Sequence, residues 1–124
     1  MKTAVILFAH GSRDPLWHAP IEAVQRRLRV LQPALIVRCA YLELTQPELP
    51  QCVAQLLSEG ARHIRILPMF LGMGRHARED LPAIVTELRS RHPEVKLEVL
   101  PALGEDPRVT EITCQIALDN LGSI

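Results

Sequence analysis

The sequence predicts an α/β fold, a three-layer sandwich built on a four-stranded, mainly parallel sheet. Apolar, β-rich runs alternate with amphipathic stretches along the chain, and the run at residues 4–9 is continuously apolar. A continuous run is typical of a strand that is buried on both faces, as the strands of parallel sheets are. Strands that alternate with helices join through right-handed crossovers, which again favours a parallel sheet.

Periodicity and the positions of proline and glycine place the individual elements. Strands are expected at residues 3–9, 35–44, 63–70 and 96–100, and helices at residues 16–31, 48–59, 77–91 and 108–121. Pro47 stands at the start of the second helix, where its missing N–H has no cost, and Gly60 is placed to end that helix. Asp106 precedes Pro107 as the expected N-cap of the last helix.

Length and charge narrow the class of protein. At 124 residues the chain is expected to form a single domain, residues 1–124. Lys plus Arg and Asp plus Glu number 14 each, so no net charge attracts nucleic acid or an anionic membrane over long range. No apolar run approaches the roughly 20 residues of a membrane span, and residues 4–9 are too short a run for a secretory signal. We therefore expect a cytoplasmic protein.

The number and spacing of the cysteines also favour a cytoplasmic protein. Cys39, Cys52 and Cys114 are odd in number, widely spaced and set among apolar neighbours. This pattern indicates reduced, mostly buried thiols and not a disulfide framework or a Cys-x-x-Cys site.

Two histidines are expected where buried strands end. His10 follows the first strand and precedes Gly11, and His76 comes shortly after the third strand. Glu43 lies at the end of the second strand. Ligands of open parallel sheets bind beyond the carboxyl ends of the strands, so we expect these three side chains to form one metal site with open positions.

Each of these residues also has a plainer interpretation. His10 is then a strand-end histidine bonded to a backbone carbonyl, and His76 a polar residue in the first turn of the third helix. Glu43 is then a carboxylate paired with a neighbouring arginine. Gly11 beside His10, which indicates an open loop, and the pairing of His76 with His10 favour the functional interpretation of the two histidines.

Three arginines flank the histidines, although the whole chain is neutral. Guanidinium groups pair well with carboxylates and phosphates, so several at one edge indicate a polyanionic ligand. A single arginine would more commonly be a solvated surface charge. The residues expected to bind such a ligand are Ser12, Arg13, Met73, Gly74, Arg75 and Arg78. Met73, together with residues 69–71, would supply an apolar floor for a flat molecule.

Other polar residues have weaker functional signals. His18, His63 and His92 have no matched partners and are expected to be structural or solvated. Ser12 beside His10 lacks the Gly-x-Ser-x-Gly elbow of a nucleophilic serine, which argues against hydrolase chemistry.

Three segments together resemble the class II tetrapyrrole chelatases, in particular the short sirohydrochlorin cobaltochelatases. They are AHGSR at residues 9–13, YLE at 41–43, and the most specific, PMFLxxGxHxxxDLP at 68–82. The resemblance extends over essentially the whole chain and implies a chelatase-like (flavodoxin-like) domain. It also implies insertion of a divalent metal, most often Co²⁺ and alternatively Fe²⁺ or Ni²⁺, into sirohydrochlorin without ATP or an organic cofactor.

The same resemblance implies roles for the site residues. In that family the histidines matching His10 and His76 bind metal and take part in catalysis, and a glutamate at the Glu43 position belongs to the same site. The substrate carries many carboxylates, which fits the arginines, and short members pair as homodimers. Which histidine acts mainly as base stays open, because metal binding and proton acceptance compete for one imidazole lone pair.

Two other classes of function compete with the chelatase. One is a tetrapyrrole- or metal-binding module that carries its ligand without catalysis. The other is a phosphate-ester enzyme that uses helix N-termini, although the chain lacks a glycine-rich phosphate loop.

Overall fold

The computed structural model describes residues 2–123, and over these residues it confirms the α/β fold. The strands are β1 (Lys2–Ala9), β2 (Ile36–Tyr41), β3 (Ala61–Pro68) and β4 (Lys96–Val99). The helices are α1 (Ala19–Leu31), α2 (Leu49–Ser58), α3 (Arg75–Arg91) and α4 (Pro107–Leu118), with short 3-10 turns η1 (Pro15–His18) and η2 (Leu103–Glu105). The sheet order is β2-β1-β3-β4 and every pair is parallel, so β2 and β4 lie at the edges.

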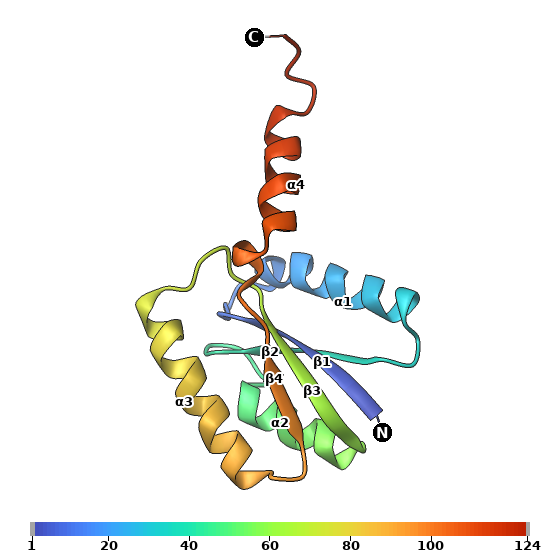
Figure 1. Cartoon of the computed structure of the whole chain (residues 1–124), viewed down its shortest axis with the longest axis vertical. Helices are drawn as coiled ribbons and strands as arrows, with labels where there is room; N and C mark the ends of the chain where they lie inside the picture. Colours follow the sequence, from blue (N-terminus) through green and yellow to red (C-terminus); the bar gives the residue numbers. More distant parts are fainter. Residues whose placement is uncertain (1, 124) are drawn as a thin grey trace.

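Helices lie on both sides of the sheet (Figure 1), and a hydrophobic cluster packs on each of its faces. On one face, Phe8 and Ile64 pack with Leu81 of α3 and with α2. On the other face, Leu7 and Val37 pack with α1. Successive side chains of a strand point to opposite faces, so the continuous apolar run of β1 contributes side chains to both clusters. Such a run is typical of a strand in the middle of a sheet, where β1 lies.

Element boundaries differ from the prediction at the end of the second strand and at the starts of two helices. The second strand ends at Tyr41 and not at residue 44, so Glu43 lies in the following loop. The helix expected over residues 16–31 begins as η1, capped by Asp14, and becomes regular only from Ala19. Helix α3 begins at Arg75, two residues before the predicted start, and therefore includes His76 in its first turn.

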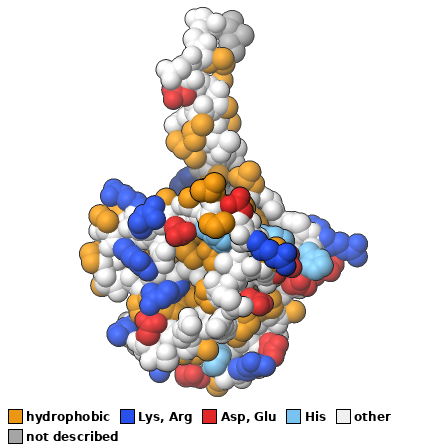
Figure 2. Space-filling model, turned by 180° about the vertical axis from the view of Figure 1, so that it is seen from behind, with side chains coloured by type: hydrophobic (Ala, Val, Ile, Leu, Met, Phe, Trp, Pro, Cys, Tyr) orange, Lys and Arg blue, Asp and Glu red, His pale blue; other side chains and the backbone are white. Residues whose placement is uncertain are grey.

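Helix α4 projects from the body of the molecule as a separate arm (Figure 1). Asp106 caps it as predicted, accepting a hydrogen bond from the backbone N–H of Arg108 at 2.8 Å. None of its residues is buried, and the side chains of Ile112 and Ile116 are exposed. Hydrophobic side chains are visible along the arm in Figure 2.

Over the part of the chain described, no helix is long and apolar enough to cross a membrane.

Candidate active site

His10 and Glu43 lie together at the carboxyl edge of the sheet. His10 directly follows β1 and Glu43 follows the neighbouring strand β2, whose Tyr41 is in register with Ala9. His10 Nε2 lies 3.2 Å from Glu43 Oε1, and the two side chains are 50% and 56% exposed. The structure thus brings together two of the three residues predicted to hold a metal, at a place open to solvent.

The backbone beyond the strands holds this pair in place. The N–H of Leu42 donates to the carbonyl of Ala9 at 2.9 Å, and the N–H of Glu43 donates to the carbonyl of His10 at 3.1 Å. Gly11 adopts a φ of +107°, and a Cβ atom there would collide with the carbonyl oxygen of Glu43. Only glycine permits both this backbone conformation and this close approach.

Phe70 forms an apolar wall beside His10. The two rings meet edge to face, with centroids 6.5 Å apart and planes at 82°, and Phe70 also packs on Phe8. The N–H of Gly104 donates to the carbonyl of Phe70 at 2.8 Å, which ties this segment to η2. Of the predicted apolar floor, Phe70 is half-buried, whereas Leu71 is 78% exposed and belongs to the surface.

His76 does not contact the His10–Glu43 pair. Its side chain is 86% exposed, and its Nε2 lies 3.5 Å from Oδ2 of Asp80, one helical turn further along α3. Among residues 2–123, no group of three or more His, Cys, Asp or Glu side chains is assembled to hold a metal ion. The three expected ligands are therefore divided: His10 and Glu43 lie together, whereas His76 is paired with Asp80.

The predicted arginines share a charged, exposed environment. Arg13 and Arg78 are exposed, and Nε of Arg75 lies 3.2 Å from a carboxylate oxygen of Glu79. Figure 2 shows histidine side chains beside basic and acidic ones on the side of the body where α3 begins. Gly74 is the N-cap of α3 and has open space around its Cα. The arginines are thus accessible to an anionic ligand, although Glu79 partly neutralises Arg75.

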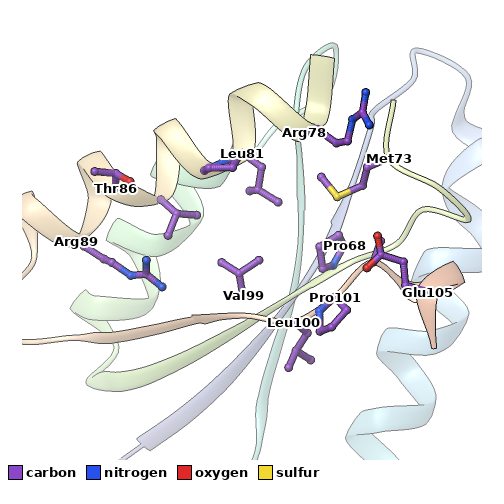
Figure 3. A pocket seen from close by; sticks show the side chains of 13 residues that line it. Pro68, Met73, Arg78, Leu81, Thr86, Arg89, Val99, Leu100, Pro101 and Glu105 are labelled. Atoms are coloured by element: carbon purple, nitrogen blue, oxygen red, sulfur yellow. The ribbon is translucent and has the colours of Figure 1, made fainter. Parts of the chain in front are cut away.

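A pocket of about 370 Å³ lies between α3 and the segment that follows β4 (Figure 3). Met73 and Arg78, two of the predicted substrate-binding residues, line it together with Leu81, Arg89 and Val99. This α3–β4 pocket does not include His10, Glu43 or His76. Its lining is largely apolar and also includes one acidic side chain, Glu105, so the pocket suits a mainly apolar group with a polar end.

The CbiX family model matches residues 4–119 of this chain. The chain belongs to the CbiX family. This confirms the resemblance seen in the three sequence segments.

Among curated relatives, the sirohydrochlorin cobaltochelatase of Methanococcus aeolicus is 33% identical over 82 residues, which cover 66% of this chain and 57% of the relative. The sirohydrochlorin ferrochelatase of Bacillus subtilis is 26% identical over 111 residues, 90% of this chain and 42% of the relative. The chain therefore spans about half the length of these relatives.

Two crystal structures show the same fold. A CbiX protein from Marinobacter aquaeolei VT8 superposes with a TM-score of 0.82 at 28% identity, covering 96% of this chain and 97% of that one. The sirohydrochlorin chelatase of Bacillus subtilis subspecies spizizenii, in complex with cobalt, superposes with a TM-score of 0.80 at 25% identity. That superposition covers 97% of this chain and 51% of the Bacillus chain.

Burial changes the acidity of three groups of this CbiX domain. It raises the pKa of Tyr41, at the end of β2, to about 12, so that the phenol stays protonated at neutral pH and cannot act as a base. Burial likewise raises the pKa of the Cys52 thiol to about 12, and it raises that of Cys39. Cys114 is exposed on α4, so the prediction of mostly buried thiols is wrong for this residue.

Two residues near the site had no role there predicted from the sequence: Thr45 was not considered, and His18 was expected to be structural or solvated. Thr45 and His18 both form hydrogen bonds with the backbone of Ser12. Thr45 lies 33 residues from Ser12, and no local pattern links such distant positions. The His76-x-x-x-Asp80 pair, in contrast, has the i, i+4 spacing of a helix-surface pair, and that spacing is legible in the sequence.

Proposed function

We propose that this chain is a sirohydrochlorin metal chelatase, which inserts a divalent metal into sirohydrochlorin without ATP or an organic cofactor, in cobalamin or siroheme biosynthesis. The observation that carries the proposal is the His10–Glu43 pair, 3.2 Å apart and open to solvent at the carboxyl edge of the sheet. Membership of the CbiX family and relatives named as sirohydrochlorin chelatases support it.

The metal ion is a substrate, and His10, Glu43 and His76 are the groups proposed to receive it. Imidazole and carboxylate together suit Co²⁺, Fe²⁺ and Ni²⁺. His76 is 86% exposed, so a rotamer change that releases it from Asp80 takes it through solvent and not through packed core. A ligand set completed in this way leaves coordination positions free for the pyrrole nitrogens.

The polar and apolar residues around the pair are proposed to hold the macrocycle. Arg13, Arg75 and Arg78 bind substrate carboxylates by charge-assisted hydrogen bonds, while Met73 contacts the apolar ring. Ser12 offers its hydroxyl to the ligand, because its backbone groups are bonded to Thr45, and Gly74 offers its backbone. These contacts orient the centre of the ring toward the metal. They also explain how a chain with no net charge can bind a polyanion.

Metal insertion requires two pyrrole protons to leave as metal–nitrogen bonds form. Glu43 or a neutral histidine is the proposed acceptor, directly or through water. A dication held beside the ring lowers the pKa of nearby pyrrole N–H groups, which helps the transfer. His10 is packed against Phe70, whereas His76 is free to turn, so we assign metal binding mainly to His10 and leave His76 able to exchange protons with solvent.

Co²⁺ is the metal we propose, with Fe²⁺ and Ni²⁺ as alternatives. A cobaltochelatase among the relatives and a cobalt-bound chelatase among the similar structures support cobalt. A ferrochelatase among the relatives supports iron equally directly, and the donor atoms favour neither.

We further propose that residues 1–124, as one domain, act in the cytoplasm as a homodimer. This chain covers 51% of the Bacillus chelatase chain, so a second copy would supply the remaining length. Helix α4 buries none of its residues, although Val109, Ile112 and Ile116 form an apolar stripe along it. On the face of the sheet that α1 covers beside β1 and β2, Arg65 of β3 is exposed and Leu67 is only half-buried. The α4 arm of a second copy is proposed to pack on this open half.

The function is tested by anaerobic absorbance of sirohydrochlorin with the protein and Co²⁺, Fe²⁺ or Ni²⁺ in turn. Initial rates above enzyme-free controls are expected, with Co²⁺ fastest. Tight binding of the metallated product with no acceleration for any metal would instead identify a carrier module. Faster insertion of Fe²⁺ or Ni²⁺ than of Co²⁺ would support the proposed chelatase activity and contradict the proposed preference for Co²⁺.

A further inference from the structure

The side chain of Thr45 fastens the loop after β2 to the loop after β1. Its Oγ1 donates to the carbonyl oxygen of Ser12 at 2.8 Å and accepts from the backbone N–H of Ser12 at 3.2 Å. Both residues are half-buried, so water competes only weakly for these bonds. One hydroxyl thereby satisfies both backbone groups of Ser12.

His18 contacts the same carbonyl. Its Nε2 lies 3.0 Å from the carbonyl oxygen of Ser12. The imidazole is itself held edge to face by Tyr41, at a centroid distance of 5.0 Å, and by Trp17, at 5.3 Å. Since Tyr41 is buried at the end of β2, His18 links Ser12 to the rigid part of the sheet.

The chain between Glu43 and Thr45 needs such support. Leu44 has a φ of +65°, and the N–H of Thr45 donates to the carbonyl of Glu43 at 2.8 Å, which closes a γ-turn of the positive-φ type. This turn is rare and strained for a residue with a side chain, and it persists only where the surroundings hold it. The side chain of Leu44 is 53% exposed and supplies little anchorage. The turn is therefore held at its two ends, by the bond from the Glu43 N–H to the His10 carbonyl and by the Thr45 hydroxyl.

We infer that Thr45, assisted by His18, is a positioning residue that sets the separation of His10 and Glu43. Thr45 is two residues from Glu43 and Ser12 is two residues from His10, so the bond between them fixes both halves of the pair. The predicted effect on catalysis rests on the proposed function, whereas the hydrogen bonds between Thr45 and Ser12 do not depend on which reaction the protein catalyses. Groups that orient metal ligands typically change metal affinity or activity by about 10- to 100-fold when removed.

Thr45→Val tests the inference because it keeps the shape of the side chain and removes the hydroxyl. We expect it to weaken binding of Co²⁺ alone about tenfold, and to lower kcat for insertion about tenfold with little change in KM for sirohydrochlorin. Thr45→Ser keeps the hydroxyl and should restore both values to within about twofold. Ser58→Ala is the matched control, since Ser58 Oγ also donates to a backbone carbonyl, that of Gln55, but on α2.

A structural readout separates this inference from the proposed function. In the NMR spectrum, the ring protons of His10 should show contacts with the side chain of Glu43 in the wild type and in Thr45→Ser, and lose them in Thr45→Val. If the wild type fails to accelerate insertion, the proposed function falls, and the Co²⁺ affinities and NMR contacts still decide the inference. Unchanged contacts and affinity in Thr45→Val, or a Thr45→Ser variant as impaired as Thr45→Val, would overturn it.

His18 provides a second route if Thr45→Val does not fold. His18→Gln keeps a donor at this position and should behave like the wild type, whereas His18→Ala should lower Co²⁺ affinity about threefold. Equal behaviour of these two variants would remove His18 from the restraint.

Discussion

The carbonyl oxygen of Glu43 occupies the space where a Cβ atom on Gly11 would have to stand. Gly11 also has a φ of +107°, a conformation that residues with side chains rarely adopt. The loops that carry His10 and Glu43 can therefore approach each other only because residue 11 is glycine. This contact makes the proximity of His10 and Glu43 a consequence of backbone packing and not merely of two side chains meeting in solvent.

Gly11→Ala is expected to separate these loops. Strain at positive φ together with the clash should lower the free energy of unfolding by about 2 kcal/mol or more, and metal insertion should be lost with it. Urea unfolding measures the first effect and the insertion assay the second. Gly72→Ala is the control, because a Cβ there meets nothing within 4 Å, and it should change stability by less than about 0.5 kcal/mol.

The three thiols are expected to react with an aromatic disulfide reagent in the order Cys114, Cys39, Cys52. The thiolate is the reactive form, and burial raises the pKa of Cys39 and raises that of Cys52 to about 12, so little thiolate forms at pH 8. Cys114 lies on α4 away from the Val109–Ile112–Ile116 stripe and should stay reactive in a dimer. Mass spectrometry after timed labelling identifies the sites. Labelling of Cys52 as fast as Cys114 would contradict the packing of α2 on the sheet.

The cap of α4 gives a pH-dependent prediction. Hydrogen bonds from the side chain and backbone of Arg108 lower the pKa of Asp106 from 3.8 to about 2. A carboxyl whose pKa is lowered on folding stabilises the folded state above its unfolded pKa, so this contribution is present at neutral pH and is lost as the pH falls from about 4 toward 2. Carbon-13 NMR of the Asp106 carboxyl should show the lowered midpoint. In Arg108→Gln the midpoint should move toward 3.8, and a wild-type midpoint already near 4 would show that the pair does not form.

The α4 arm should control association. Ile112→Glu combined with Ile116→Glu places charges on its apolar stripe, and we expect this variant to sediment as a monomer while the wild type sediments as a dimer. Val30→Glu, on α1, is the control, because Val30 is 67% exposed and Ile116 is 69% exposed. A wild-type protein that sediments as a monomer at micromolar concentration would remove the homodimer from the account.

Much of the fold was predictable because local pattern and burial coincide. The apolar run of β1 is continuous because its strand is central, and Asp106 followed by Pro107 marks the start of α4 in sequence and in structure alike. Periodicity does not predict which surface the apolar face of an amphipathic helix packs against. The stripe on α4 predicts an apolar face but does not say whether that face packs on its own sheet, and here it does not.

The site was predictable only in part, for a similar reason. Strand ends placed His10 and Glu43 at one edge, and their pairing follows from the adjacency of β1 and β2. His76 was expected beside them, but it lies in the first turn of α3, where its imidazole contacts Asp80 one helical turn away. The Ser12–Thr45 bond was not foreseen, because it depends on two loops meeting in space.

The most direct measurement is the initial rate of Co²⁺ insertion into sirohydrochlorin by the wild type and by the variant with both His10→Ala and His76→Ala. Both side chains are at least half exposed, so the variant should keep the circular dichroism and unfolding midpoint of the wild type. We expect a wild-type rate well above the enzyme-free rate, and a variant rate equal to the enzyme-free rate. A folded variant that still inserts Co²⁺ faster than the enzyme-free control would contradict the assignment of the site.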